Sequence, residues 1–388
     1  MYKVKTMNKI SKIGLAQLDD RFEISDNMEH EDAILVRSAK LHDYDFPAEL
    51  KAIARAGAGV NNIPLDRAAE AGVVVFNTPG ANANGVKELT IAALLLASRK
   101  IAQGITWVKE QSAAGADIAA VVEKGKSAYV GPEIGGKTLG VVGLGAIGVM
   151  VANAAAGLGM KIVGYDPFLS VKNALNLTPG AEIVATLDEL YGKADYISLH
   201  LPMNADTKGS VNAAAFAAMK DGVRIVNLAR GELVDTAALK DALGSGKCAA
   251  YVTDFPNSET AALDGVVCIP HLGASTPESE ENCAIMAARE LSDYLLTGNI
   301  RNSVNFPNVE MARGGVARLA ILHRNVPNML SNILTLLGKE GANIENRVNK
   351  SKGEYAYTLI ELSQAITGET LDHVRNIDGV LRLRIIKY

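Results

Sequence analysis

The sequence predicts an α/β protein with two doubly wound parallel sheets and a small C-terminal βαββαβ module. The chain has 388 residues, a length that suits two or three domains. Short β-branched runs alternate with helical segments as far as His271, a pattern typical of βα units and parallel sheets. Beyond that point the expected order of elements changes to βαββαβ, as in ferredoxin-like modules.

Composition excludes several classes of protein. Apolar residues make up 48% and charged residues 21% of the chain, as in globular proteins and unlike disordered or collagen-like ones. The net charge of −4 gives no sign of a nucleic-acid partner. Three cysteines cannot form a disulfide framework, which favours a reducing, cytoplasmic compartment. The N-terminal MYKVKTMNKISK lacks an apolar run of signal-peptide length.

The stretch from Leu139 to Met160 carries no charge and is long enough to be tested as a membrane span. Its early glycines fall where a strand should turn into a helix, and β-branched residues precede them. We therefore expect a strand, a turn and a helix here, and no membrane partner.

The first domain is expected to cover residues 1–82 and to be completed by residues 275–303 after the chain returns. Its strands are expected at residues 12–15, 32–36, 52–54 and 73–76. Each is a short apolar run, and the turn-forming sequence Asn77-Thr78-Pro79-Gly80 closes the last one.

The second domain is expected to cover residues 83–274. It begins with a helix over 86–110, whose run from Leu89 to Leu96 is apolar nearly all round and should be buried. A weaker segment, 111–138, should form a short helix and a loop. Regular alternation follows, with strands expected at 139–142, 161–165, 196–199, 224–227, 249–253 and 266–269 and helices at 146–158, 187–190, 212–219 and 236–243. A helix over 277–296 is long enough to return to the first domain.

A linker is expected at residues 304–317, followed by the C-terminal module over 318–388. Its strands are expected at 316–322, 343–348, 355–361 and 380–386, and its helices at 328–337 and 371–376. This order of elements defines the βαββαβ arrangement.

The sequence Gly143-Leu144-Gly145-Ala146-Ile147-Gly148 fits the dinucleotide-binding pattern G-x-G-x-x-G. It follows an expected strand, opens an expected helix, and precedes a strand that ends in Asp166, 18 residues past Gly148. Gly143 permits the tight turn, Gly145 lets the backbone approach a pyrophosphate, and Gly148 allows close helix packing. Asp166 would accept hydrogen bonds from ribose hydroxyls and repel a 2′-phosphate, so the predicted cofactor is NAD. No metal is predicted.

Three polar residues follow strands of the second domain: Arg230, Glu259 and His271. The carboxyl ends of strands line the ligand crevice of a doubly wound sheet, so all three point to one place. An imidazole can take the proton of an alcohol that loses a hydride, and a guanidinium can grip a carboxylate bidentately. An ordinary loop histidine after Pro270 is the alternative reading of His271.

The blocks VNLARGELVD, TDFPNSE and IPHLGAST resemble the signature blocks of the D-isomer-specific 2-hydroxyacid dehydrogenases. The resemblance implies that Arg230 binds the substrate carboxylate and carbonyl, that His271 exchanges the proton, and that Glu259 orients His271. Many relatives carry Glu-Pro around the acid and a longer loop before the histidine, whereas only 12 residues separate Glu259 from His271 here. Glu280 and Glu281 follow on a helix and are expected to be surface residues.

The same resemblance assigns further contacts to the cofactor. Besides the glycine turn and its first helical residues, it implies contacts from His200, Pro202, Ala229, Asp254 and Gly273. Asp235 more simply caps the helix that starts at Thr236.

Substrate recognition is expected at the ends of two strands of the first domain. Backbone N–H groups of a glycine turn hold carboxylates, and nearby cations suit a phosphate. The residues proposed to bind substrate are Arg37, Ser38, Arg55, Gly57, Ala58, Gly59 and Lys126. Members of the family that oxidise 3-phosphoglycerate, the entry step of serine biosynthesis, use arginines at such positions, and in some a basic residue near Lys126 reaches in from a neighbouring subunit. A homo-oligomer is therefore expected. Plain solvated cations are the alternative.

The C-terminal module resembles an ACT domain, a regulatory module that binds amino acids. In serine-inhibited members of the family, residues that match His323, Asn325 and Asn343 hold L-serine between paired modules. Relatives usually have glycine where this chain has Asn328, and asparagine tolerates the left-handed backbone that such a turn needs. A module that only dimerises is the alternative.

Two other functions stay open at this stage. One is a dehydrogenase of the same family that acts on glyoxylate, hydroxypyruvate or 2-oxoglutarate. The other is a nucleotide-sensing interaction protein, because corepressors of this fold resemble the enzymes in their polar residues.

Overall fold

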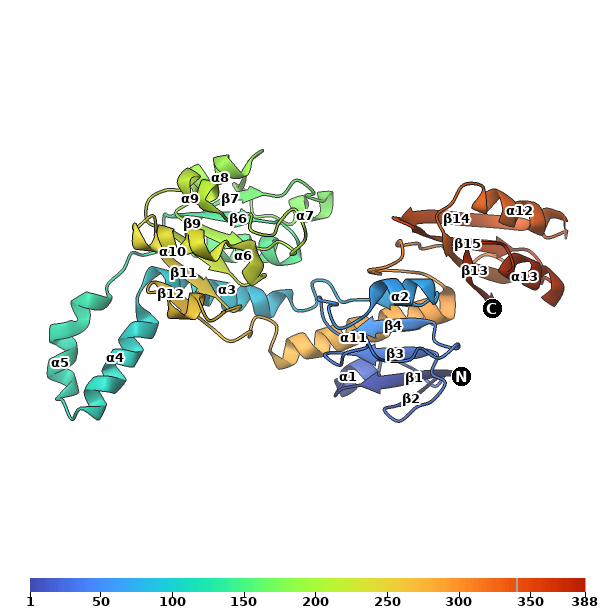
Figure 1. Cartoon of the computed structure of the whole chain (residues 1–388), viewed down its shortest axis with the longest axis horizontal. Coiled ribbons are helices and arrows are strands. Elements are labelled where there is room, and N and C mark those ends of the chain that lie inside the picture. Colours follow the sequence, from blue (N-terminus) through green and yellow to red (C-terminus); the bar gives the residue numbers. More distant parts are fainter. Residues whose placement is uncertain (340, 388) are drawn as a thin grey trace. The chain divides into compact units, whose positions relative to one another are not determined.

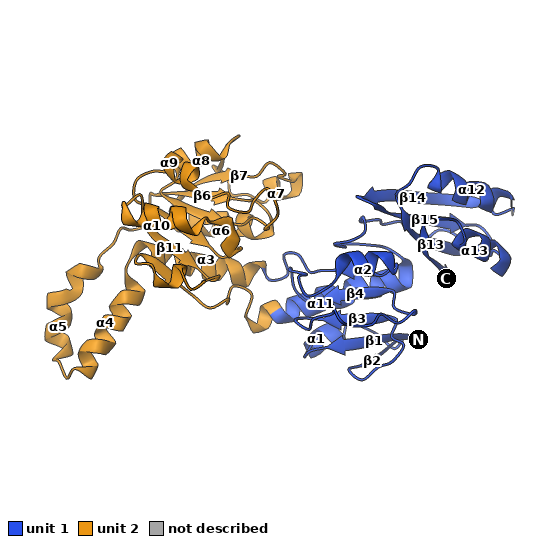
Figure 2. Cartoon of the chain, in the orientation of Figure 1, with its two compact units in different colours: residues 1–82, 280–388 blue, residues 83–279 orange. Residues whose placement is uncertain are grey.

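The structure, a computed structural model, describes residues 1–339 and 341–387. Glu340 and Tyr388, both within the expected C-terminal module, lie outside the described residues. The chain forms two compact units (Figure 1, Figure 2). The first contains residues 1–82 and the chain from Glu280 onward, and the second contains residues 83–279.

The first unit contains a five-stranded parallel sheet in the order β2-β1-β3-β4-β5. Its strands are β1 (Tyr2–Met7), β2 (Phe22–Ser25), β3 (Ala33–Val36), β4 (Ala52–Arg55) and β5 (Val74–Phe76). Ala33 and Leu35 pack in the cluster that includes α11 (Pro277–Thr297), whereas Ile34 and Val36 pack in the cluster that includes α2 (Leu65–Glu70). Because both faces are covered, β3 has no hydrophobic alternation.

The prediction of a strand at residues 12–15 is wrong. These residues form a short helix, α1 (Lys12–Leu15), and the first strand is β1, which was not predicted. A Cβ placed on Gly14 would lie 2.4 Å from the Cβ of Ala284, so α1 packs directly against α11. Strand β1 was missed because Lys3 and Lys5 interrupt its apolar residues.

The second unit contains a seven-stranded parallel sheet in the order β12-β11-β10-β9-β6-β7-β8. Its strands are β6 (Thr138–Val142), β7 (Lys161–Tyr165), β8 (Glu182–Ile183), β9 (Tyr196–Leu199), β10 (Val223–Asn227), β11 (Cys248–Thr253) and β12 (Val266–Cys268). The strand order reverses between β6 and β9, and ligands bind at the carboxyl ends of strands beside such a reversal. The predicted doubly wound fold class is confirmed.

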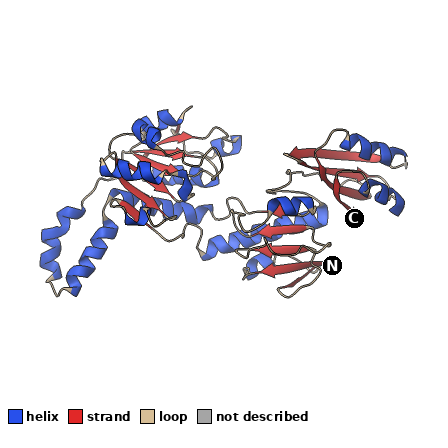
Figure 3. Cartoon of the chain, in the orientation of Figure 1, coloured by secondary structure: helices blue, strands red, loops and turns tan. Residues whose placement is uncertain are grey.

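Helices cover both faces of this sheet (Figure 3). They are α3 (Ala83–Ser98), α6 (Ala146–Gly157), α7 (Val171–Leu175), α8 (Leu187–Lys193), α9 (Ala213–Ala218) and α10 (Thr236–Gly244), with short 3-10 turns η2 (Gly231–Leu233) and η3 (Thr260–Ala262). Helices α3 and α6 pack in one core cluster, and α8, α9 and α10 pack in the other.

The single helix predicted over 86–110 is wrong, because the chain bends by 68° between α3 and α4 (Ile101–Ala113). The side chain of Arg224 donates to the carbonyl of Ala97 at 3.0 Å, and the Ser98 hydroxyl bonds to Tyr196 Oη at 2.8 Å. Side chains on β10 and β9 therefore bond to the last residues of α3, where a continuing helix would otherwise supply the partners.

Helices α4 and α5 (Ile118–Gly125) form an arm that extends from the second unit (Figure 1). Neither helix has a buried residue, and the turn η1 (Lys126–Tyr129) returns the chain. Trp107 and Tyr129 pack with ring centroids 5.3 Å apart inside the arm.

The uncharged stretch from Leu139 to Met160 divides into β6, a turn and α6, as predicted. Among the described residues no single helix is long and apolar enough to cross a membrane, although α3 and α4 together pass a test of length and composition. Half of α3 is buried in the core of the second unit.

The C-terminal module has the predicted βαββαβ order, with an antiparallel sheet in the order β14-β15-β13-β16. Its elements are β13 (Ala317–Arg324), α12 (Met329–Lys339), β14 (Ile344–Lys352), β15 (Tyr355–Leu362), α13 (Gly368–Arg375) and β16 (Val380–Lys387). Leu319 and Ile360 face α12 and α13, whereas Leu322 and Leu359 join the core of the preceding sheet domain. The module therefore belongs to the first compact unit.

A buried ion pair anchors this module to the end of α11. Arg318 and Glu361 are 0% and 1% exposed, and Arg318 Nε donates to Glu361 Oε1 at 2.6 Å. The same guanidinium donates to the carbonyls of Thr297, Met311 and Ala312. One side chain thus joins β13, β15 and the segment between α11 and β13.

Candidate active site

The glycine turn of the second unit has the geometry that its sequence predicts. Gly143 has a left-handed φ of 93°, and a Cβ there would lie 2.6 Å from the carbonyl oxygen of His200. A Cβ on Gly148 would lie 1.9 Å from the Gly143 oxygen. A Cβ on Gly145 would meet no atom within 4 Å, so space for a ligand remains at the start of α6. Ala146 and Ile147 are the first residues of that helix.

Asp166 follows β7 and lies beside this turn. Its Oδ2 accepts from the Leu144 N–H at 2.8 Å, and its Oδ1 accepts from the Phe168 N–H at 2.8 Å. The carboxylate therefore shapes the turn and retains lone pairs for hydroxyl donors. Burial lowers the pKa of His200 to about 4, so this imidazole is neutral at pH 7, and it bonds to Ser198 Oγ at 2.9 Å.

The structure brings Arg230 and His271 together through a residue that sequence reasoning did not select, Phe255. The rings of Phe255 and His271 have centroids 4.3 Å apart with planes at 47°. The Cζ atom of Arg230 lies 5.5 Å from the centroid of the same Phe255 ring. A base candidate and a carboxylate-binding candidate therefore share one aromatic support after β10, β11 and β12.

A second residue missed from the sequence, Asn227, holds the loop that carries Arg230. Asn227 is fully buried at the end of β10 and donates to the Arg230 carbonyl at 2.8 Å and to Tyr251 Oη at 3.0 Å. Its Oδ1 accepts from the Ala229 N–H at 3.2 Å. A buried amide at the end of an expected strand was the available signal, because such a group must find partners.

Asp254 lies one residue past β11 and is 1% exposed. Its Oδ2 accepts from the Gly273 N–H at 3.2 Å, whereas its Oδ1 has no hydrogen-bond partner among the described residues. Burial raises the pKa of this carboxyl, and the Gly273 N–H, His271 and Arg230 act against the increase. One oxygen of Asp254 is thus buried without a partner among the described residues.

Glu259 is not placed against His271. It is exposed at the start of η3, and its N–H donates to Asn257 Oδ1 at 3.0 Å. No hydrogen bond or ion pair in the described part of the chain joins Glu259 to His271. The orienting role of Glu259 therefore stays a prediction, as do the catalytic roles of Arg230 and His271.

In the first unit, Arg37 and Ser38 follow β3 on a loop that Asn8 organises. Asn8 has a φ of 75°, and its Oδ1 accepts from the Ser38 N–H at 3.0 Å and from the Ala39 N–H at 2.8 Å. Arg37 Nη2 pairs with Glu280 Oε1 at 2.6 Å. Glu280, expected to be a plain surface residue, is thus engaged with a predicted substrate-binding arginine.

Arg55 lies over the glycine turn that follows β4. Its Nε donates to the Arg37 carbonyl at 3.1 Å, and a Cβ on Gly57 would lie 2.3 Å from Arg55 Nη1. Gly57 has a φ of 152°, which also disfavours a side chain there. The Ala58 carbonyl accepts from the Asn77 side chain at 2.6 Å, and Gly59 is the next residue of this turn. Arg37 and Arg55 are thus brought together.

Two other predicted contacts lie on exposed segments of the second unit. Lys126 begins η1 at the end of the arm and pairs with Glu123 at 2.6 Å. Pro202 follows β9 by a few residues, and its carbonyl accepts from the Thr207 hydroxyl at 2.6 Å.

The three predicted effector residues do not converge within one C-terminal module. His323 is 2% exposed and uses both ring nitrogens, toward the Arg324 carbonyl and the Thr358 hydroxyl, each at 2.8 Å. His323 pairs with Ala356 at one end of the sheet, whereas Asn343 precedes β14 at the opposite end. Asn328 has a φ of 64°, so the asparagine adopts the left-handed conformation.

Comparison with known proteins places these observations in a family. Residues 91–273 match the sequence model of the D-isomer specific 2-hydroxyacid dehydrogenase, NAD binding domain. A D-3-phosphoglycerate dehydrogenase of Methanocaldococcus jannaschii is 34% identical over 340 residues, which cover 85% of this chain and 62% of that protein. A candidate D-3-phosphoglycerate dehydrogenase of Schizosaccharomyces pombe is 32% identical over 339 residues, which cover 80% of this chain and 68% of that protein.

The chain belongs to the D-isomer specific 2-hydroxyacid dehydrogenase family. Its second unit is accordingly the NAD-binding domain of that family, which confirms the predicted dinucleotide fold and cofactor class. A crystal structure of NAD+-bound 3-phosphoglycerate dehydrogenase from Entamoeba histolytica is similar, with a TM-score of 0.60 and 26% identity, and covers 78% of this chain and 98% of that one. The chain spans about three fifths of the length of the first curated relative, 62%.

Proposed function

We propose that this 2-hydroxyacid dehydrogenase oxidises 3-phospho-D-glycerate to 3-phosphohydroxypyruvate with NAD, the first step of L-serine biosynthesis. The observation that carries the proposal is the arrangement of Arg230 and His271 around Phe255 at the carboxyl edge of the NAD-binding domain. The names of the relatives and the paired arginines Arg37 and Arg55 support a phosphorylated substrate.

The residues of the turn fit a dinucleotide. Gly145 leaves space at the start of α6, where backbone N–H groups attract a pyrophosphate. Asp166 offers a carboxylate to ribose hydroxyls, and its charge disfavours the 2′-phosphate of NADP. Asp254 offers an unpartnered buried oxygen. When bound, NAD supplies the acceptor for the hydride that leaves C2 of the substrate.

The side chains of this protein would bind the substrate and transfer the proton. Arg230 would bind the substrate carboxylate through two N–H donors and keep the reacting carbon in place. His271 would take the proton of the C2 hydroxyl as the hydride leaves, so that the alcohol becomes a ketone and the imidazole an imidazolium. Arg37 and Arg55 would bind the phosphate. Glu259 is assigned the orienting role on the resemblance to the family.

We further propose that the active form is a homo-oligomer. Among the described residues, helices α4 and α5 have no buried residue. Even the apolar residues Ile101 and Ile105 on α4 are 42% and 53% exposed. Such apolar exposure on an extended arm favours a second subunit as its partner. Lys126 at the end of that arm would then reach a neighbouring active site. The cytoplasmic location also stays a prediction.

Regulation by L-serine is proposed to need two copies of the C-terminal module. His323 and Asn343 lie at opposite ends of a strand pair that is eight residues long, a separation of roughly 25 Å. Strand β14 is the edge of the sheet, so a second module added there antiparallel would place one copy's His323 and Asn325 near the other's Asn343. A module that only dimerises is the alternative.

The test is the absorbance of NADH on addition of 3-phosphohydroxypyruvate, compared with glyoxylate, hydroxypyruvate and 2-oxoglutarate. We expect kcat/KM to be higher for the phosphorylated ketone by about tenfold or more, because charged hydrogen bonds contribute roughly 1.5–3 kcal/mol. Equal or greater activity on an unphosphorylated ketone would overturn the substrate assignment. If the protein turns over none of these ketones but binds a transcription factor, the result would favour a nucleotide-sensing interaction protein. Suppression by L-serine would support the effector site.

A further inference from the structure

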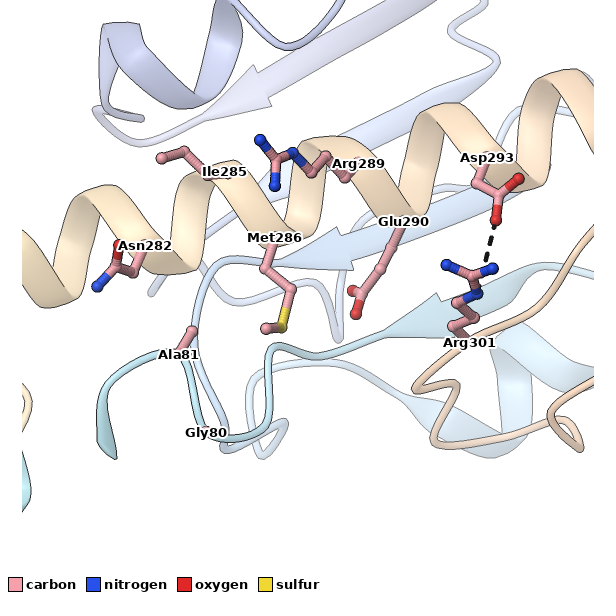
Figure 4. Close-up of a pocket in the computed structure, with 9 residues that line it drawn as sticks. All are labelled: Gly80, Ala81, Asn282, Ile285, Met286, Arg289, Glu290, Asp293 and Arg301. Atoms are coloured by element: carbon pink, nitrogen blue, oxygen red, sulfur yellow. Dashed lines mark ion pairs between the residues drawn. The ribbon is translucent and has the colours of Figure 1, made fainter. Parts of the chain in front are cut away.

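The first unit contains a pocket that none of these roles uses. It has a volume of about 720 Å³ and lies along α11 (Figure 4). Gly80 and Ala81, which follow β5, form one wall, and Met286, Glu290 and Asp293 of α11 form another. Arg301, just past α11, closes one end. All of these residues belong to the first compact unit.

A buried carboxyl group without a full set of partners faces this pocket. Glu290 is 7% exposed, and Figure 4 shows its carboxyl directed from α11 toward the loop of Gly80 and Ala81. Its Oε1 accepts from Asn302 Nδ2 at 2.5 Å, whereas its Oε2 has no hydrogen-bond partner among the described residues. Buried polar atoms are normally bonded, so Oε2 calls for a donor that the chain itself does not supply.

The residue that donates to the Glu290 carboxyl, Asn302, has an unfavourable backbone conformation. Asn302 has a φ of 55°, in the left-handed region, and donates its side-chain amide to Glu290. Its carbonyl also accepts from the Asn77 N–H at 3.3 Å. A left-handed non-glycine residue costs free energy and persists where surrounding contacts determine it. The Glu290 carboxyl is therefore held in one position.

Burial raises the pKa of Glu290 to about 8, so the carboxyl is mostly protonated at pH 7 while the pocket holds no cation. An ammonium group beside Oε2 would favour the ionised form, and the proton would leave for the solvent. The charged groups near the carboxyl are Asp293, Arg289 and Arg301, which include both signs.

Arg301 provides the opposite charge at the other end. Its Nη2 pairs with Glu310 at 2.6 Å, and its Nε lies 3.9 Å from an oxygen of Asp293. A guanidinium has five N–H donors, so these two contacts leave donors for a further anion. Ala81 and Met286 supply apolar surface on the side of Glu290 away from Arg301 (Figure 4).

We propose that this pocket binds a free α-amino acid with an apolar side chain, its ammonium on Glu290 and its carboxylate on Arg301. The apolar side chain lies against Ala81 and Met286. The order of groups is what recognises the ligand: an apolar wall at one end, the buried carboxyl of Glu290 in the middle, and the guanidinium of Arg301 at the other end. The pocket volume is of the size that holds small ligands, roughly 300–1,000 Å³.

The first experiment is calorimetric titration of the full chain with L-leucine at pH 7. Binding is expected with a Kd between about 10 µM and 1 mM. Repeating the titration in phosphate and Tris buffers, which differ in ionisation enthalpy, should show release of close to one proton. Two analogues test the two ends: 4-methylpentanoate lacks the ammonium, 3-methylbutylamine lacks the carboxylate, and each should bind about tenfold or more weakly because a charged hydrogen bond is lost.

Variants test the residues. Glu290→Gln should weaken L-leucine binding about tenfold or more and abolish proton release. Glu23→Gln, on the exposed edge strand β2, is the matched control and should bind like the wild type. If Glu290→Gln fails to fold, Met286→Trp fills the pocket and should abolish binding in a chain whose folding is checked by thermal unfolding.

Four outcomes would overturn the proposal. The wild type could give no heat with L-leucine at tens of millimolar, or it could bind 4-methylpentanoate as tightly as L-leucine. Folded Glu290→Gln could bind L-leucine as tightly as the wild type, or Asn343→Ala could lose binding of L-leucine. The first would leave Oε2 with an ordered water only, and the last would place the amino acid in the C-terminal module. The titration needs no turnover, so its result is independent of the proposed dehydrogenase activity.

Discussion

The phenyl ring of Phe255 packs on the imidazole of His271, with ring centroids 4.3 Å apart and planes at 47°. Phe255 follows β11 and His271 follows β12, so the contact joins two loops at the carboxyl edge of the sheet. An aromatic neighbour restricts the rotation of the imidazole and contributes about 0.5–1.5 kcal/mol beyond the area that it buries. The contact positions His271 without a hydrogen bond from Glu259.

Replacement of His271 by asparagine should reduce kcat by roughly 10²–10⁴-fold, because general acid–base catalysis contributes that much. Binding of NADH, followed by its fluorescence, should be unchanged. The exposed residue His42 provides the control, and His42→Asn should retain wild-type kcat. Near-normal turnover by His271→Asn would remove His271 from the mechanism.

Replacement of Asn227 by alanine should reduce kcat/KM and also the free energy of unfolding. The change leaves the Arg230 carbonyl and Tyr251 Oη without a donor, which costs about 1–3 kcal/mol. The KM for the 2-oxo acid should rise, since the loop that carries Arg230 is no longer held. Asn212→Ala removes the N-cap of α9 and should lower stability by about 0.5–2 kcal/mol with unchanged KM. Equal kinetics for the two variants would contradict a positioning role of Asn227.

Replacement of Glu280 by glutamine should lower the KM for the phosphorylated ketone. The Glu280 carboxylate pairs with Arg37 at 2.6 Å and competes with the phosphate for that guanidinium. Both side chains are partly exposed, so the effect should be at most about fivefold, as for a surface pair of 0.2–1 kcal/mol. Steady-state kinetics with phosphorylated and unphosphorylated ketones measures the change, which should be absent for the unphosphorylated ones. Glu278→Gln is the control, and a similar decrease in it would argue against the competition.

Replacement of Arg318 by methionine should destabilise the first unit by about 3–5 kcal/mol, because it leaves a buried charge on Glu361. The double variant Arg318→Met with Glu361→Leu should lose less than the sum of the single variants. Urea unfolding of the three proteins measures this difference. Additive losses would show that the two charges act independently.

Stability should fall with increasing pH through the titration of Glu290. Its pKa is raised from 4.5 to about 8 in the folded state, so folded chains keep a proton that unfolded chains release between these values. The free energy of unfolding should therefore decrease from pH 4.5 to 8 and then level off, by up to a few kcal/mol. Glu290→Gln should remove this slope and be more stable than wild type at pH 9, as urea unfolding at pH 5, 7 and 9 would show. A parallel pH dependence in both proteins would contradict the assignment.

Local patterns predicted most of the fold, and particular residues show where they failed. The turn from Gly143 to Gly148 was predictable because its G-x-G-x-x-G spacing, the strand before it and the helix after it all lie within one βα unit. The break between α3 and α4 was not, because the partners of Ala97 and Ser98 are Arg224 and Tyr196, which are 127 and 98 residues away. Strand β1 was not predicted because Lys3 and Lys5 interrupt its apolar residues.

The sequence by itself determined the alternation of strands and helices, the NAD-binding turn with Asp166, and the placement of Arg230 and His271 after their strands. These depend on periodicity and on residues close in the chain. Only the tertiary structure decided that Phe255 supports His271, that Glu280 pairs with Arg37, and that Glu290 lies buried beside a pocket. Such contacts join elements distant in sequence, and their partners depend on how helices and strands pack, which local pattern does not encode.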